Sequence, residues 1–172
     1  PGPRPILDDE VLLFDFGAQV DGYRSDMTRT LFVGEPTVRD LAIYELVARA
    51  QAAAISVLHA AVAGGGGGGG ERPSGRALDA AARAVITDAG HGEHFGHGTG
   101  HGIGLATHEA PSLGQRAAET PLPSPTVFSV EPGVYLDGEM GVRIEDLVVV
   151  DADAGRVELL TRFPREVIVV GG

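Results

Sequence analysis

A stretch of alternating glycines and histidines, residues 96–109, limits what this chain can form more than any other feature. Five of the six histidines lie in it or just before it: His91, His94, His97, His101 and His108. The spacing of His97 and His101 matches the zinc pair of a metalloprotease helix. However, glycines occupy every second position from 98 to 104, and each costs a helix about 0.8–1.0 kcal/mol relative to alanine. We therefore expect extended backbone, with glycines where another segment passes close and both histidines on one face.

The clustered imidazoles favour a metal site or a catalytic site, because imidazole binds metals and transfers protons near neutral pH. A phosphate-binding loop is the alternative for a glycine-rich run, but this one lacks the lysine of such a loop. His59 lies within an expected helix, and His91 and His94 precede the glycines. We interpret these three as ordinary helix-face and loop residues.

Composition bounds the class of protein. A chain of 172 residues, 43% hydrophobic and 22% charged, is expected to form one globular domain, residues 1–172. Its net charge of −11 argues against nucleic acid or an anionic membrane as a partner. The absence of cysteine excludes disulfides and fits a reducing compartment, so we expect a cytoplasmic protein. The apolar run 41–63 is long enough to span a membrane, but Glu45, Arg49, Gln51 and His59 interrupt it, which favours a helix of a soluble fold.

The expected elements are strands, then two helices, then further strands, an order typical of an α+β fold. Hydrophobic runs predict a buried strand at 11–16 and strands at 27–33, 127–130 and 142–150. One or two more are expected within 157–170.

Two helices are expected in the middle of the chain. Thr37 is the natural N-cap of a helix over 38–63, and Ser74 of a helix over 75–89. The seven consecutive glycines Gly64–Gly70 separate them and are expected to act as a flexible connector within the domain.

Four carboxylates occur within or directly beside apolar strands: Asp15, Asp26, Glu131 and Glu145. Burying several carboxylates together is prohibitive unless cations neutralise them. Two divalent ions would balance four carboxylates and a neutral histidine, and an oxygen-rich set suits Mn²⁺, with Co²⁺, Fe²⁺ or Zn²⁺ as alternatives. Taken singly, an acidic residue at a strand end is more often a turn cap or a surface charge. We interpret four others in that way: Asp21, Asp137, Glu139 and Asp146.

Four motifs follow one another between about residues 10 and 150: Asp15-Phe16-Gly17-Ala18 with Gly22 to Thr30, His97 to Leu105 with His108-Glu109, Val130-Glu131-Pro132-Gly133-Val134-Tyr135, and Gly141-Val142-Arg143-Ile144-Glu145-Asp146. In this order they resemble the pita-bread metallopeptidases, specifically the Xaa-Pro branch of aminopeptidase P and prolidase. Methionine aminopeptidases resemble the chain less, because the His97/His101 pair and the last two motifs look like the Xaa-Pro branch. The resemblance implies an antiparallel sheet covered by helices.

The resemblance also implies a site and an activity. The residues that match the family's ligands to two divalent ions are Asp15, Asp26, His101, Glu131 and Glu145. The implied reaction is hydrolysis of an N-terminal Xaa-Pro bond in proline-containing peptides, with Glu131 also moving a proton. His97 and His108 would hydrogen-bond the substrate and the tetrahedral intermediate. Arg143 would brace the ligand carboxylates, with Tyr135 as a further candidate for this role.

Family members carry further helices and strands before the first aspartate motif, whereas this chain begins at Pro1. We therefore expect the C-terminal portion of a longer protein, with the N-terminal part of the fold missing. One sheet face would then be uncovered, an apolar patch that favours aggregation or pairing into a homo-oligomer.

The leading hypothesis is an Xaa-Pro aminopeptidase. An Xaa-Pro dipeptidase (prolidase) is the alternative within the family. A truncated, inactive binding module that keeps the fold and a protein with a single metal ion are the rival hypotheses.

Overall fold

The computed structural model describes residues 2–64 and 72–171, so the connector predicted for Gly64–Gly70 lies outside the described residues from Gly65 onward. The helices and strands are, in chain order, β1 (Val11–Phe16), β2 (Gln19–Val20), β3 (Tyr23–Arg24), β4 (Met27–Val33), α1 (Val38–Gly64), α2 (Gly75–Asp88), the short 3₁₀ helix η1 (Gly92–His94), β5 (Gly100–Gly102), β6 (Glu109–Leu113), β7 (Thr126–Val130), β8 (Gly133–Leu136), β9 (Met140–Arg143), β10 (Asp146–Asp151), β11 (Arg156–Leu159) and β12 (Ile168–Val170). This order confirms the predicted α+β class.

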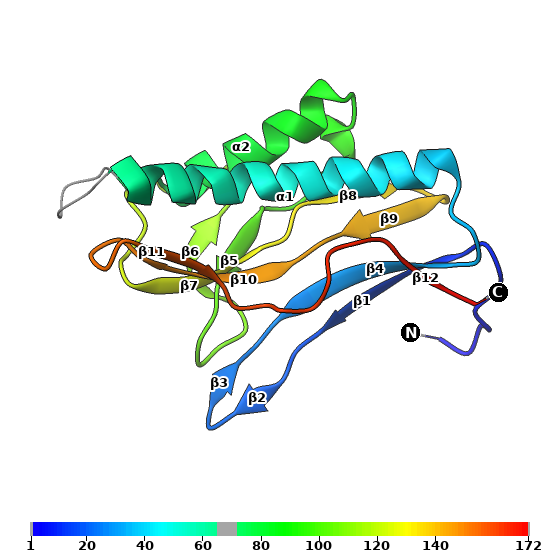
Figure 1. Ribbon diagram of the computed structural model, residues 1–172, viewed down its shortest axis with the longest axis horizontal. Helices are drawn as coiled ribbons and strands as arrows, with labels where there is room; N and C mark the ends of the chain where they lie inside the picture. Colours follow the sequence, from blue (N-terminus) through cyan, green and yellow to red (C-terminus); the bar gives the residue numbers. More distant parts are fainter. Residues whose placement is uncertain (1, 65–71, 172) are drawn as a thin grey trace.

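The strands form two main sheets and two hairpins (Figure 1). One sheet has the order β1-β4-β12, and the other has the order β11-β10-β7-β5-β6. The hairpins are β2–β3 and β8–β9. The strand pairs are antiparallel except for β12, which runs parallel to β4.

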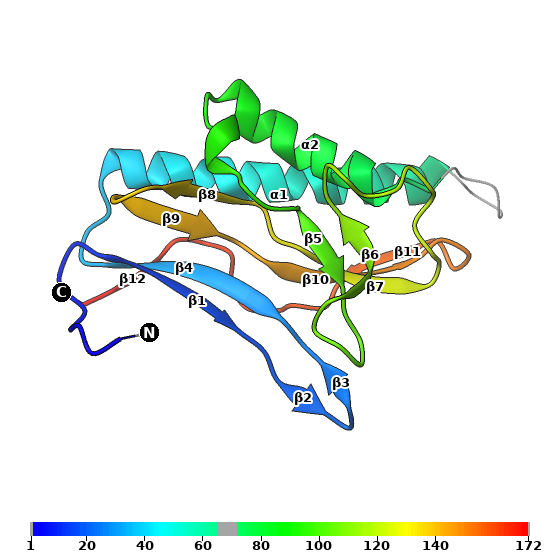
Figure 2. The same ribbon diagram turned by 180° about the vertical axis from the view of Figure 1, so that it is seen from behind.

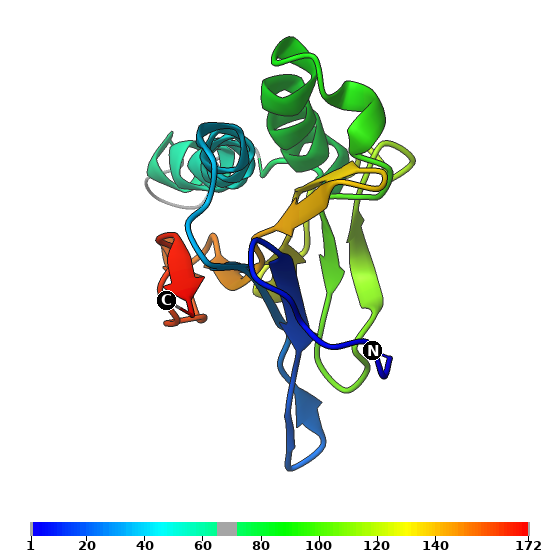
Figure 3. The same cartoon turned by 90° about the vertical axis from the view of Figure 1, so that its right-hand side faces the viewer.

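Both helices lie next to each other on one side of the strands, and the β2–β3 hairpin projects on the other side (Figure 3). The predicted caps are present. The Asp40 backbone N–H donates to Thr37 Oγ1 at 3.2 Å, and Thr37 N–H donates to Asp40 Oδ2 at 2.9 Å, a reciprocal capping box. Ser74 accepts from Ala77 N–H at 3.1 Å at the start of α2.

The core lies between the helices and the sheets. The α1 residues Val47, Ala50, Ala54 and Leu58 are fully buried. By length and composition, Val38–Ala63 could cross a membrane, but a core helix meets the same test. Here α1 contributes to the core and packs against α2, β7, β8, β9 and β11.

Strand β1 differs from its prediction. It forms the outer strand of its sheet, and its second half is exposed, with Phe14 at 46% and Phe16 at 55%. The buried strand predicted for 11–16 is therefore wrong in its environment, although its bounds are right. Phe14, Phe16, Val20 and Tyr23 leave apolar side chains exposed along this edge and the adjoining hairpin, as expected for an uncovered part of the sheet.

The single strand predicted for 142–150 is also wrong. The chain leaves the β8–β9 hairpin after Arg143 and enters the five-stranded sheet at Asp146, with Ile144 and Glu145 between the two strands. An apolar run alone does not reveal such a change of sheet, because it does not show which strands pair with each half of the run.

Candidate metal centre

A tight hairpin brings the first two candidate ligands together. Asp21 (φ 50°) and Gly22 (φ 90°) adopt left-handed conformations between β2 and β3, as a two-residue hairpin turn requires. At the base of this hairpin Ser25 N–H donates to Ala18 O at 2.9 Å, so the segment after β3 lies beside the segment before β2. Asp15 and Asp26 consequently line the same cavity.

The third candidate ligand is held by close packing of glycines. A Cβ on Gly100 would lie 1.9 Å from Ser129 O, and one on Gly102 would lie 2.1 Å from Ala110 O. The predicted close approaches of the glycines are therefore confirmed, whereas the expected extended backbone is limited to β5, Gly100–Gly102, and the start of β6. His101, between these glycines, donates from Nδ1 to Gly102 O at 3.1 Å. In a neutral imidazole this hydrogen bond leaves Nε2 as the free metal-binding nitrogen.

A cavity of about 460 Å³ is lined by all five predicted ligands together with His108. Figure 2 shows β1 and β5, the strands that carry Asp15 and His101, from the side opposite to that of Figure 1. Ligand atoms of Asp26, His101 and Glu145 lie within 4.8 Å of one another. His101 Nε2 is 3.2 Å from Glu131 Oε1 and 4.0 Å from Asp26 Oδ2. The ring of His108 lies 4.0 Å from that of His101 between centroids.

The clustering of acidic side chains in this cavity shifts their pKa values and that of His101. Burial, and then the charge of Glu131, raise the pKa of Glu145 to about 8. Burial and the Asp15 charge raise the pKa of Asp26. Burial alone would lower the pKa of His101, but hydrogen bonds to Glu131 and Gly102 and the nearby carboxylates raise it to about 9. The protein without cations thus holds extra protons at this site, as expected where positive charge is needed.

The donor set fits a divalent cation. Glu145 is 2% exposed, and its Oε1 has no hydrogen-bond partner among the described residues. Its other oxygen accepts from Thr28 Oγ1 at 2.6 Å. Carboxylate oxygens with one imidazole nitrogen suit Mn²⁺ and related ions. Such an ion would also give the buried Glu145 Oε1 the partner that it lacks among the described residues.

Thr28 on β4 and Ser129 on β7 hydrogen-bond candidate ligands. Ser129 Oγ donates to Glu131 Oε1 at 2.8 Å and accepts from His101 N–H at 3.0 Å. Sequence reasoning missed both residues. The available signal was their spacing, because each lies two positions from a candidate carboxylate, and alternate residues of a strand share a face.

Arg143 contacts two of the candidate carboxylates. Its Nη2 is 2.5 Å from Asp15 Oδ2, its Nε is 4.0 Å from Glu131 Oε2, and Nε also donates to Thr28 Oγ1 at 3.1 Å. Its Nη1 donates to the Tyr135 hydroxyl at 2.9 Å. The guanidinium therefore lies between two candidate ligands from different segments of the chain, Asp15 and Glu131.

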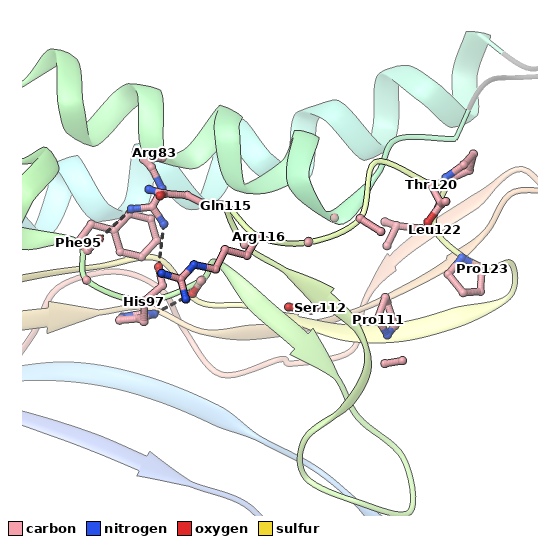
Figure 4. Close-up of a pocket in the computed structure, with 18 residues that line it drawn as sticks. Arg83, Phe95, His97, Pro111, Ser112, Gln115, Arg116, Thr120, Leu122 and Pro123 are labelled. Carbon is pink, nitrogen blue, oxygen red and sulfur yellow. Dashed lines mark hydrogen bonds between the residues drawn. The ribbon is translucent and has the colours of Figure 1, made fainter.

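His97 lies outside the carboxylate cavity and is connected to the carboxylates through Tyr135 and then Arg143. His97 Nδ1 donates to Gly98 O at 2.8 Å, so in a neutral ring Nε2 accepts from the Tyr135 hydroxyl at 2.7 Å. The strand begins at Gly100, and the alternation that was expected to align His97 with His101 does not extend to it. His97 instead lines a larger cavity of about 980 Å³ with Arg83 and Arg116 (Figure 4).

The acidic residue Asp146 was misinterpreted as a turn cap or surface charge. It is 1% exposed and accepts from Arg29 Nη2 at 2.6 Å. The interpretation failed because the pairing arginine lies 117 positions earlier in the chain. His91 and His94 were interpreted as loop residues, and they contact each other at η1, Nδ1 to Nδ1 3.2 Å, without lining the carboxylate cavity.

Comparisons with known proteins place this fold and sequence among described peptidases. The model of metallopeptidase family M24 matches residues 1–152. The chain is 40% identical over 153 residues to an Xaa-Pro dipeptidase from Lactobacillus delbrueckii subsp. lactis, covering 89% of this chain and 38% of that protein. It superposes on the crystal structure of a dipeptidase from Pyrococcus horikoshii OT3 with a TM-score of 0.86 and 40% identity, covering 99% of this chain and 44% of the other.

An X-Pro aminopeptidase from Thermotoga maritima MSB8 is similarly related, with a TM-score of 0.81 and 38% identity. The match covers 95% of this chain and 42% of that one. The chain thus spans less than half the length of these relatives, and it has their pita-bread fold.

Proposed function

The chain belongs to metallopeptidase family M24, and on that premise we propose that it carries the metal centre of a hydrolase for N-terminal Xaa-Pro bonds. The observation that carries this proposal is the cavity in which Asp15, Asp26, His101, Glu131 and Glu145 converge. We also propose that residues 1–172 belong to the catalytic domain and that the enzyme is cytoplasmic. The exposed apolar edge at Phe14 and Phe16 supports pairing with further protein surface, for which a homo-oligomer is our proposal.

We further propose that the site holds two divalent cations, preferably Mn²⁺, with Co²⁺, Zn²⁺ or Fe²⁺ as substitutes. Four carboxylates and one imidazole would balance the charge of two such ions. When bound, the cations supply an acidified water and polarise the scissile carbonyl.

Glu131 is proposed to move the proton of the reaction. Its Oε1 lies 3.2 Å from His101 Nε2 and accepts from Ser129 at 2.8 Å, so the carboxylate is held in one orientation. These hydrogen bonds outweigh burial and lower the pKa of Glu131. A carboxylate that is ionised at neutral pH can accept a proton from the attacking water and pass it to the leaving proline nitrogen.

Three further side chains would act on the substrate or on the ligands. His108 lies in the carboxylate cavity against His101 and is proposed to donate to the oxyanion as charge develops on it. His97 would bind the substrate from the neighbouring cavity, exchanging its hydrogen bond with Tyr135. Arg143 would fix Asp15 and Tyr135 by its two forked nitrogens.

The length of the peptide substrate distinguishes an Xaa-Pro aminopeptidase from an Xaa-Pro dipeptidase. Our sequence-based proposal is an aminopeptidase, and the Lactobacillus relative named Xaa-Pro dipeptidase favours prolidase activity as the second candidate. The test measures metal content per chain and hydrolysis of an Xaa-Pro dipeptide and an Xaa-Pro tripeptide with added Mn²⁺. Cleavage of the tripeptide supports the aminopeptidase, and cleavage of the dipeptide alone supports the dipeptidase. Two bound ions without any cleavage would contradict the proposed activity for this chain, and no bound ion would contradict the proposed centre.

A further inference from the structure

One amide on α1 contacts the backbone beside two of the proposed ligands. Gln51 is 1% exposed, and its Nε2 lies 3.2 Å from Val130 O, 3.2 Å from Ile144 O and 3.1 Å from Asp146 Oδ2. Val130 directly precedes Glu131, and Ile144 directly precedes Glu145. A single side chain therefore joins the two strand ends that present the glutamates.

Arg29 on β4 completes this arrangement. It is 1% exposed, and its guanidinium makes as many hydrogen bonds as it has N–H groups. Nε donates to Pro164 O at 2.8 Å, and Nη2 donates to Phe163 O at 2.8 Å and Asp146 Oδ1 at 2.6 Å. Nη1 donates to Thr28 O at 2.8 Å and to Glu145 O at 2.6 Å. The backbone of Glu145 is thereby held from β4.

Gln51 and Arg29 donate to carbonyls that lie between two strands, where no neighbouring strand among the described residues supplies a backbone donor. Ile144 and Glu145 lie between β9 and β10, at the change of sheet. A buried carbonyl without a hydrogen-bond donor lowers the stability of the fold by about 1–3 kcal/mol, because the group has lost its water and gained no partner. Gln51 and Arg29 supply the donors for these two carbonyls, and Asp146 links them by accepting from both.

We propose that Gln51 and Arg29 are positioning residues for the metal centre, acting through the backbone of Glu131 and Glu145. The inference rests on the proposed function, because it assigns the two glutamates to metal binding. Neither side chain lines the carboxylate cavity. Their effect on metal affinity must therefore come from the angle at which the two strand ends present their carboxylates. Figure 1 shows α1 running along the strands from which these ends come.

The test replaces Gln51 by methionine, which keeps the volume and removes the amide. Leu58→Met is the matched control, because Leu58 is a fully buried α1 residue and the exchange also conserves volume. Binding of Mn²⁺ is measured by calorimetry, the visible absorption of bound Co²⁺ reports ligand geometry, and thermal unfolding is followed in EDTA. Arg29→Lys, which keeps the charge but has fewer donors, is the second variant.

Gln51→Met is expected to bind Mn²⁺ about 10–100-fold more weakly, as outer partners of metal ligands typically do when removed, and to alter the Co²⁺ spectrum. Leu58→Met is expected to retain both properties, which separates positioning from a loss of packing. Arg29→Lys is expected to weaken binding in the same range and decides the test if Gln51→Met does not fold. If the folded Gln51→Met variant keeps the wild-type Mn²⁺ affinity and Co²⁺ spectrum, this inference is overturned and the proposed function is not affected. A wild-type chain that binds no Mn²⁺ would overturn the proposed function and this inference together.

Discussion

Replacing Glu145 by glutamine is expected to stabilise the metal-free protein while removing its stabilisation by metal. Glu145 is 2% exposed, and burial, followed by the charge of Glu131, raises its pKa to about 8. Glutamine has nearly the same shape and carries no charge. It keeps an oxygen for the hydrogen bond from Thr28 and offers an amide to the neighbouring carboxylates.

The magnitude follows from the difference between the folded and unfolded pKa values. At pH 7 the unfolded chain has Glu145 ionised, whereas the metal-free folded protein holds the proton. Each pH unit above the ordinary value of 4.5 costs about 1.4 kcal/mol of stability, which gives about 3 kcal/mol at pH 7. Because the folded pKa is raised, this cost is absent below pH 4.5 and grows until about pH 8. The advantage of Glu145→Gln should therefore increase over the same window.

The assay is urea unfolding followed by circular dichroism in EDTA, at pH 5 and at pH 7. Glu119→Gln is the matched control, because the Glu119 side chain is 76% exposed and pairs with Arg76 at the surface. Such exposed pairs contribute about 0–1 kcal/mol. The control should therefore change stability little at either pH.

An advantage of Glu145→Gln that is equal at pH 5 and pH 7, or a less stable variant at pH 7, would refute the reasoning. Addition of Mn²⁺ supplies a second criterion. At 100 times its dissociation constant, a ligand stabilises the protein that binds it by about 2.7 kcal/mol. Wild-type protein should gain this amount and the glutamine variant much less, and equal gains would refute the assignment of Glu145 as a ligand.

Three further outcomes are expected. His101→Ala should abolish metal-dependent hydrolysis, because it removes the imidazole of the centre, and undiminished turnover of an Xaa-Pro peptide would contradict the assignment. Asp79→Ala should lower the free energy of unfolding, measured in urea, by about 3 kcal/mol. Asp79 is buried, accepts from Arg83 through both oxygens and accepts from Thr99, so its removal leaves these donors unpaired. A loss below about 1 kcal/mol would contradict a stabilising role for these contacts. Metal binding at pH 7 should release protons, because the pKa of His101 is raised to about 9 and the ligand must be neutral. Calorimetry in two buffers of different ionisation enthalpy measures this release, and identical heats would contradict it.

The sequence predicted those parts of the molecule that depend on residue type at one position. The caps at Thr37 and Ser74 need a side-chain oxygen next to a helix start, and both are present. Gly100 and Gly102 need the absence of a Cβ, and the neighbouring carbonyls lie where a Cβ would clash. Each of these features has a local physical cause, so a short window of sequence is enough to find it.

The parts that could not be predicted depend on which segments meet. The apolar pattern of 11–16 indicates a strand, but its exposure depends on what covers Phe14 and Phe16. The break at Ile144 depends on β9 and β10 joining different partners, β8 and β7. The burial of Asp146 depends on Arg29, which reaches it from another sheet.

The same distinction explains why the sequence indicates candidate ligands and Arg143, but not Ser129, Thr28, Gln51 or Arg29. A metal ligand must be one of a few residue types, so Asp26, His101 and Glu145 can be recognised from chemistry and order. The positioning that we propose for Glu145 acts through the carbonyls of Ile144 and Glu145, and every residue has a carbonyl. The sequence retains one trace of this arrangement, a buried amide at Gln51 within an alanine-rich helix. Burying an amide is unfavourable unless it finds partners, so a lone polar residue on the inner face of such a helix indicates that buried acceptors lie opposite it.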